Sequence, residues 1–278
     1  MNTKKILLVS LIACMHCFSF AQDKKAKHVN YYKPVIAETK EISVDIQDAV
    51  SMVEFSKFKL RLTNKTNDYI LYKPKESLFK LSSGDFVPED KKTILIQPLD
   101  KESKVIDMKA GADKNAHVDN YTFLLGGLYK IVTNSPITEA PAFMLPAASN
   151  SFTAGNFTVE LLSLSKKTGE TSAKFKVTYS GKGAGLVDPK KLAVKVDTKT
   201  TPGQMFANDK KEKGMILYQG ETDTFTASFH IEGKLVDMQF ANMEIIWKDT
   251  FKDCQIVKLD ETSIELVLDP GMTAGKNK

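Results

Sequence analysis

Apolar and polar residues alternate along most of this chain. Ile42, Val44 and Ile46 are separated by polar residues, and similar short runs follow up to residue 268. A period of two is typical of strands that bury one face. Helical periodicity is nearly absent, and turn-forming residues such as Gly126-Gly127 separate the runs. The sequence therefore predicts an all-β fold, with strands at 42–46, 55–62, 69–72, 78–81, 93–96, 105–108, 121–125, 128–132, 157–164, 173–179, 192–196, 215–218, 224–231, 243–247, 255–259 and 263–268.

The strand pattern repeats once along the chain. An internal repeat of this length indicates a duplicated domain rather than a solenoid unit, whose period is about 20–50 residues. The matched segments are offset by 115, 117 and 115 positions, which predicts a two-residue insertion before Phe175. They are Val44-Asp45-Ile46 with Val159-Glu160-Leu161, Phe58-Lys59-Leu60 with Phe175-Lys176-Val177, and Tyr72-Lys73-Pro74-Lys75 with Val187-Asp188-Pro189-Lys190.

The repeat and the composition together predict a domain organisation. Residues 41–133 and 151–269 form the two domains, and the connection 134–150 between them is rich in Pro and Ala. Three prolines in that connection disfavour both a helix and a central strand. We expect residues 22–40 to form a basic, flexible N-terminal tail and residues 270–278 to form a disordered C-terminal tail.

One pattern in the first copy resembles a known family. Phe58-x-Leu60-x-Leu62-Thr63-Asn64, followed by Tyr69-Ile70-Leu71-Tyr72-x-Pro74, is similar to the immunoglobulin-like domains of bacterial secreted and surface proteins. The resemblance covers about half of each copy, and about seven strands per copy suit such a domain. It implies two tandem immunoglobulin-like β-sandwich domains and no functional residue.

The first 21 residues have the layout of a secretory signal. Lys4 and Lys5 precede an apolar run, and small residues precede a cleavage point between Ala21 and Gln22. An alternative is lipidation, because Leu11-Ile12-Ala13-Cys14 matches the box at which bacterial lipoproteins are acylated on cysteine. Either interpretation predicts export to the periplasm, the cell surface or the medium, with a membrane anchor only if Cys14 is lipidated.

Charge and cysteine content exclude several classes of function. The net charge of +5 falls to +3 after removal of the two leader lysines, and Arg61 is the only arginine. Recognition of nucleic acid depends on arginine, so we expect no nucleic-acid partner. Cys254 is the only cysteine outside the leader, which leaves no disulfide within the chain and no thiolate metal site.

The sequence contains no recognisable catalytic, cofactor-binding or metal-binding motif. Nucleophilic catalysis needs a base beside the nucleophile, whereas His28, His117 and His230 lie far apart and none is near a Gly-x-Ser-x-Gly motif. We therefore predict no catalytic residue, no cofactor and no metal ligand. Tyr31 and Tyr32 are the candidate ligand contacts, because the flanking tail offers no core in which to bury them.

These observations favour a non-enzymatic binding or interaction module of the cell envelope. A surface rich in lysine favours acidic partners, so the expected partner is an envelope protein or an anionic surface glycan. The first alternative is a carbohydrate-binding or carbohydrate-active accessory protein. The second is a hydrolase with a site between the two domains.

Overall fold

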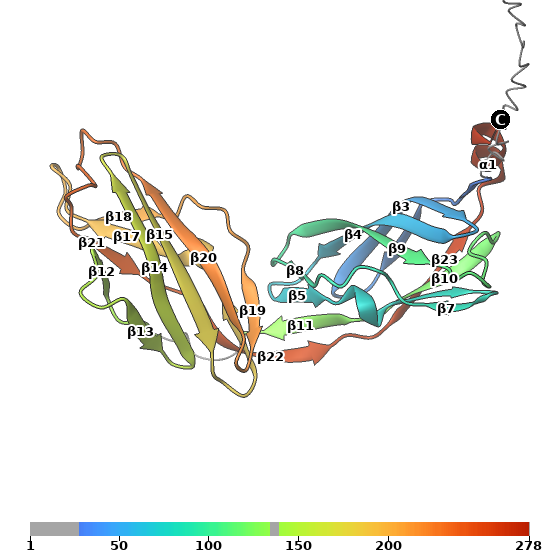
Figure 1. The fold of residues 1–278 in the computed structure, drawn as a ribbon, viewed down its shortest axis with the longest axis horizontal. Helices are drawn as coiled ribbons and strands as arrows, with labels where there is room; N and C mark the ends of the chain where they lie inside the picture. The colour runs from blue at the N-terminus through green and yellow to red at the C-terminus, as the bar shows by residue number, and fades with distance from the viewer. Residues whose placement is uncertain (1–27, 134–138, 278) are drawn as a thin grey trace, which may run out of the picture.

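A computed structural model describes residues 28–133 and 139–277, and these residues form an all-β protein with two lobes (Figure 1). We call the lobes the first and second units. The strands within residues 28–133 are β1 (Asn30–Tyr31), β2 (Val35–Glu38), β3 (Ile42–Met52), β4 (Phe55–Asn64), β5 (Tyr69–Tyr72), β6 (Leu78–Leu81), β7 (Gly84–Phe86), β8 (Ile94–Ile96), β9 (Lys101–Lys109), β10 (Asn120–Leu125) and β11 (Leu128–Val132).

The second half of the chain repeats this order. Its strands are β12 (Phe143–Leu145), β13 (Ser151–Ala154), β14 (Phe157–Lys167), β15 (Glu170–Tyr179), β16 (Ala184–Val187), β17 (Ala193–Val196), β18 (Gln204–Ala207), β19 (Met215–Tyr218), β20 (Thr222–His230), β21 (Met243–Ile246), β22 (Phe251–Lys258) and β23 (Thr262–Val267). The helical elements are the 3₁₀ turns η1 (Pro74–Glu76) and η2 (Pro189–Lys191) and the helix α1 (Pro270–Lys276). None of the described helices has the length and apolar character needed to cross a membrane.

The repeat is visible in the pairing of the strands. β3, β4 and β9 are consecutive neighbours in one sheet, and β14, β15 and β20 are consecutive neighbours in another. Val44 lies opposite Leu62 and Val159 lies opposite Val177, so Leu62 and Val177 are equivalent. The expected insertion before Phe175 is therefore wrong, because the offset stays at 115 residues through these two strands. Alternating apolar residues made a shift of two positions invisible in the sequence.

The last strand of each copy lies in the other unit. β12 pairs with β21 in the second unit, and Phe143 and Leu145 enter the second core. β23 pairs with β10 in the first unit, and Ile264 and Leu266 enter the first core. The two copies thus exchange their terminal strands reciprocally. The first unit consists of β1–β11, β23 and α1, and the second consists of β12–β22.

A single six-stranded sheet joins the two units, in the order β19-β16-β22-β11-β5-β8. β22 makes this possible because it pairs with β16 through residues 251–254 and with β11 through residues 255–258. Val132 of β11 lies opposite Gln255 of β22. These are equivalent positions, since Leu128 faces Tyr72 in the first copy as Phe251 faces Val187 in the second. The order of the sheet is therefore symmetric about this central pair.

Several expected boundaries differ from the structure. β23 falls within the predicted second domain, 151–269, but packs in the first unit. The predicted connection, 134–150, contains the paired strand β12, and residues 134–138 of it lie outside the described part. The predicted flexible tail, 22–40, contains β1 and β2, both paired with β3. The predicted disordered tail contains α1, which is capped by the Asp269 carboxylate through the amide of Met272.

Candidate functional site: a groove between the two units

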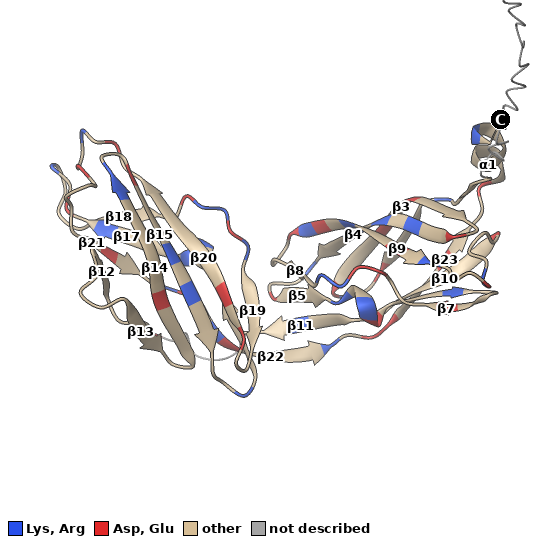
Figure 2. Cartoon of the chain, in the orientation of Figure 1, with Lys and Arg blue, Asp and Glu red and all other residues tan. Residues whose placement is uncertain are grey.

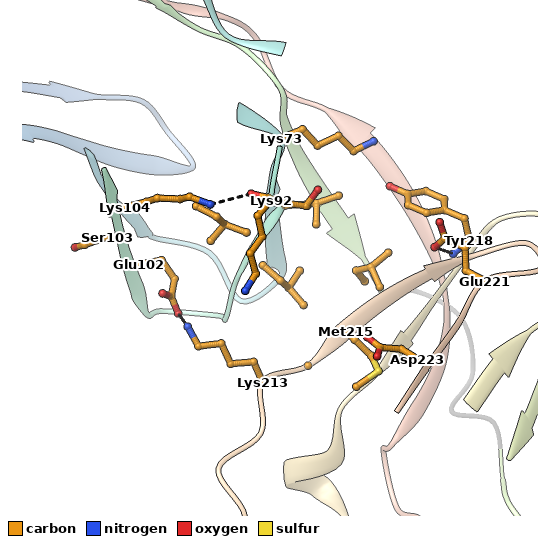
Figure 3. A pocket seen from close by; sticks show the side chains of 16 residues that line it. Lys73, Lys92, Glu102, Ser103, Lys104, Lys213, Met215, Tyr218, Glu221 and Asp223 are labelled. Carbon is orange, nitrogen blue, oxygen red and sulfur yellow. Dashed lines mark hydrogen bonds and ion pairs between the residues drawn. The ribbon is translucent and has the colours of Figure 1, made fainter. Parts of the chain in front are cut away.

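A groove of about 580 Å³ lies between the two units, which is within the usual size range of ligand sites (Figure 3). Its first wall comes from β5, β8 and β9, and its second wall comes from β19 and β20. Leu71, Leu95 and Ile216 line it, and all three belong to an apolar cluster on the six-stranded sheet. The groove therefore has an apolar base to which both units contribute.

The outer strands of the six-stranded sheet form part of both walls. β8 pairs with β5 alone and β19 pairs with β16 alone, among the strands that the structure describes. Residues 94–95 of β8 and 215–216 of β19 line the groove. An outer strand leaves one row of backbone N–H and C=O groups without a strand partner. Part of each edge is already occupied, because the amide and carbonyl of Tyr218 bond to Glu221 and the carbonyl of Ile96 accepts from Asn64. The earlier residues of β8 and β19 are the part of each edge that can still pair.

Charged residues at equivalent positions line the two walls. Lys92 stands two residues before β8, and Lys213 stands two residues before β19. Glu102 is the second residue of β9, and Asp223 is the second residue of β20. Lys213 forms an ion pair with Glu102 from one wall to the other (Figure 3). The equivalent residues, Lys92 and Asp223, are not among the ion pairs of the described residues. Within the described residues, one of the two equivalent pairs therefore forms an ion pair across the groove and the other does not.

A lysine and two tyrosines lie beside the groove. The Lys73 Nζ lies 4.8 Å from the ring centre of Tyr129 and 5.3 Å from that of Tyr218. The Tyr129 hydroxyl donates to the Glu76 carboxylate, and this hydrogen bond, with burial second, raises the pKa of Tyr129 to about 12. The Tyr218 hydroxyl is buried and has no hydrogen-bond partner within the described part of the chain. A buried hydroxyl normally has a partner, so this one is an unsatisfied polar group beside the groove.

Polar contacts near the groove link the two units. The Tyr69 hydroxyl donates to Asp188 Oδ2 at 2.6 Å, and the Lys190 Nζ donates to Gln97 Oε1 at 3.1 Å. Asp188 is buried and also caps η2 by accepting from the amide of Lys190. Burial, followed by the hydrogen bond to Asp188, raises the pKa of Tyr69 far above its ordinary value. These hydrogen bonds fix the position of one wall of the groove relative to the other.

The tyrosines predicted to contact a ligand lie elsewhere. Tyr32 is 3 % exposed and belongs to the first core, and its hydroxyl donates to the carbonyl of Val118. It is therefore not a ligand contact. Tyr31 is half-buried, with the Lys276 Nζ 4.9 Å from its ring centre and its amide donating to Thr273. Cys14 and the predicted cleavage point, Ala21 and Gln22, lie outside the described residues.

The structure places the histidines at two surface positions. His28 Nδ1 and His117 Nε2 are 3.1 Å apart, a proximity that 89 residues of separation conceal in the sequence. Desolvation, with the nearby His28 second, lowers the pKa of His117. His230 lies 3.1 Å from Asp209, and its side chain is 61 % exposed. In the described part of the chain, no group of three or more His, Cys, Asp or Glu residues is arranged to hold a metal ion.

Sequence reasoning missed the groove. Its lining comes from segments about 120 residues apart, and its floor contains ordinary strand residues. The one available signal was the repeat. Lys92 and Lys213 precede equivalent apolar strands, and Glu102 and Asp223 occupy equivalent positions in the strands that follow those. Aligning the copies beyond residue 81 would have shown that these charges are duplicated.

Comparison with known proteins does not assign a family. No protein-family model matches the chain, and no curated protein matches it. Among solved structures, AerE from Microcystis aeruginosa is 9 % identical in an alignment that covers 84 % of this chain and 99 % of that one, with a TM-score of 0.13. A TM-score this low carries no argument about fold or function.

Proposed function

We propose that this protein is an exported, non-enzymatic binding module of the cell envelope that holds its ligand in the groove between the two units. The observation that carries the proposal is the groove itself, with its apolar floor, the two strand edges and the buried Tyr218 hydroxyl. Export is part of the proposal and rests on the signal-like layout of residues 1–21. We further propose that each unit is an immunoglobulin-like β-sandwich, which suits its antiparallel sheets around a shared core.

The distribution of charge favours a protein partner over an anionic glycan. Four lysines and three acidic residues line the groove, so both signs of charge meet the ligand. Both signs also lie along β3, β4, β14 and β15, where Lys176 pairs with Glu160 at 2.6 Å and Arg61 with Asp45 at 3.3 Å (Figure 2). A polyanion is favoured by a surface of one sign, whereas a polypeptide carries both.

The aromatic residues of the groove also weigh against a sugar. Sugar binding by stacking needs an open aromatic face, and the groove region offers Tyr129 and Tyr218. The Lys73 ammonium lies over both rings. Stacking of a sugar would therefore have to displace this lysine, which supports an envelope protein as the partner.

The test is a comparison of baits in an envelope extract. The mature chain should retain envelope material, and Ile216→Asp, which places a charge in the groove floor, should abolish that retention. Phe240→Asp is the matched control, because Phe240 is 77 % exposed and is not part of the groove lining. Circular dichroism checks that both variants fold. Retention of the same material by all three baits would reject the groove as the binding site.

A further inference from the structure

The outer edges of β8 and β19, which are free at Ile94 and Ile216 among the described residues, are the starting point for a more specific inference about the ligand. β8 and β19 occupy equivalent places at the two ends of one six-stranded sheet, and both line the same groove. The backbone groups on the open part of each edge can take hydrogen-bond partners, which side chains of a folded ligand do not supply in regular order. An extended polypeptide segment supplies them in the required order, as in binding by strand addition.

The floor of the groove suits the side chains of such a segment. Leu95 and Ile216 are only partly buried although both are apolar, whereas their neighbours Ile94 and Met215 pack against the first and second cores. Successive side chains of a strand point to opposite faces. A bound strand with apolar residues at alternate positions would therefore cover this floor with one face and present its other face to solvent.

The charges of the groove supply complementarity to a segment that carries both signs. Lys213 and Glu102 already neutralise each other across the groove. The equivalent residues Lys92 and Asp223 do not pair with each other within the described structure, and they lie on opposite walls (Figure 3). An acidic side chain of the ligand can meet Lys92, and a basic one can meet Asp223.

We infer that the ligand is an extended polypeptide segment that pairs with the edges of β8 and β19, places alternate apolar side chains on the floor, and meets Lys92 with an acidic side chain and Asp223 with a basic one. This inference rests on the proposed function and names the partner class of that same groove.

The direct test uses synthetic peptides of about eight residues, a length that extends beyond both strand edges. One set has Val, Ile or Leu at alternate positions with Glu and Lys between them. A matched set has the same side chains but N-methylated amides at alternate residues, so it cannot form the backbone hydrogen bonds. We expect the first set to bind and to slow amide hydrogen exchange in β8 and β19. N-methylation should weaken binding about tenfold or more, since several hydrogen bonds are lost.

Charge reversal tests the predicted ion pairs separately. Lys92→Glu should weaken the peptide that carries Glu, and replacing that Glu with Lys in the peptide should restore binding. Lys109→Glu is the matched control, because Lys109 is an exposed residue at the other end of β9 and does not line the groove. An equal effect of the two substitutions would count against the assignment of Lys92.

The failures of the two proposals can be told apart. If no peptide binds, or if N-methylated peptides bind equally well, strand pairing is rejected. The groove remains the binding site in that case if Ile216→Asp still abolishes retention of a protease-resistant envelope ligand. If Ile216→Asp has no effect on retention either, both the inference and the proposed function fail.

Discussion

Truncation of Leu266 tests the reciprocal exchange of strands, which is the main departure of this fold from two tandem domains. Leu266 lies in the last strand of the second copy, yet its side chain is fully buried in the first core and its strand pairs with β10. Leu266→Ala should therefore destabilise the first unit. In a tandem arrangement the same change would destabilise the second unit, since β23 would pair with β21.

The expected magnitude follows from burial. Replacing a fully buried leucine with alanine costs about 2–5 kcal/mol, because apolar contacts are lost and a cavity remains. Amides that exchange by opening of the first unit should then exchange faster by about 30-fold to several thousandfold, at a factor of ten per 1.4 kcal/mol. An effect of this size is well above that of a surface substitution.

Amide hydrogen exchange read by mass spectrometry resolves the two units. Leu266→Ala should accelerate exchange more in β10 than in β21. The equivalent leucine in β12, Leu145, is also fully buried but lies in the second core, so Leu145→Ala should produce the opposite order. Trp247 is the only tryptophan and is buried in the second core, so its fluorescence should follow Leu145→Ala more closely. Equal acceleration by the two variants, or the reverse order, would refute the exchange.

Three further outcomes are expected. Burial raises the pKa of the Cys254 thiol to about 11, so alkylation at pH 8 should be slow in the folded protein and fast in urea, as measured by mass spectrometry; rapid labelling of the folded chain would contradict its burial. The fold favours the protonated phenol of Tyr129, whose pKa is raised to about 12, so its contribution to the free energy of unfolding is complete below about pH 10 and is lost as the pH rises to about 12. Glu76→Gln should lower the pKa of Tyr129 in an absorbance titration. Tyr69→Phe should reduce the free energy of unfolding by about 1–3 kcal/mol in urea, because the buried Asp188 loses a donor, and an unchanged midpoint would show that this contact is not needed.

The alternation of apolar residues was enough to predict the strands but not all of their partners. The expected strands at 69–72, 78–81 and 215–218 coincide with β5, β6 and β19, because burial of one face imposes a period of two. The period says which side of a strand is buried and leaves open which core buries it. β12 shows the consequence, since its Phe143 and Leu145 were recognisable as apolar positions while their place in the second core was not.

The same limit explains why the groove escaped prediction while its duplicated charges were present in the sequence. Exchange of the terminal strands requires the chain to cross between the units twice, once after β11 and once within β22, and these two strands pair at the crossing. That pairing merges two three-stranded sheets into one and brings the equivalent outer strands β8 and β19 to a common groove. Lys92 and Lys213, or Glu102 and Asp223, are ordinary surface charges in a single unit. They line a common groove only because the exchange brings the two copies together. If the groove binds the ligand as proposed, disruption of the β11–β22 pairing should abolish binding without altering any residue of the groove.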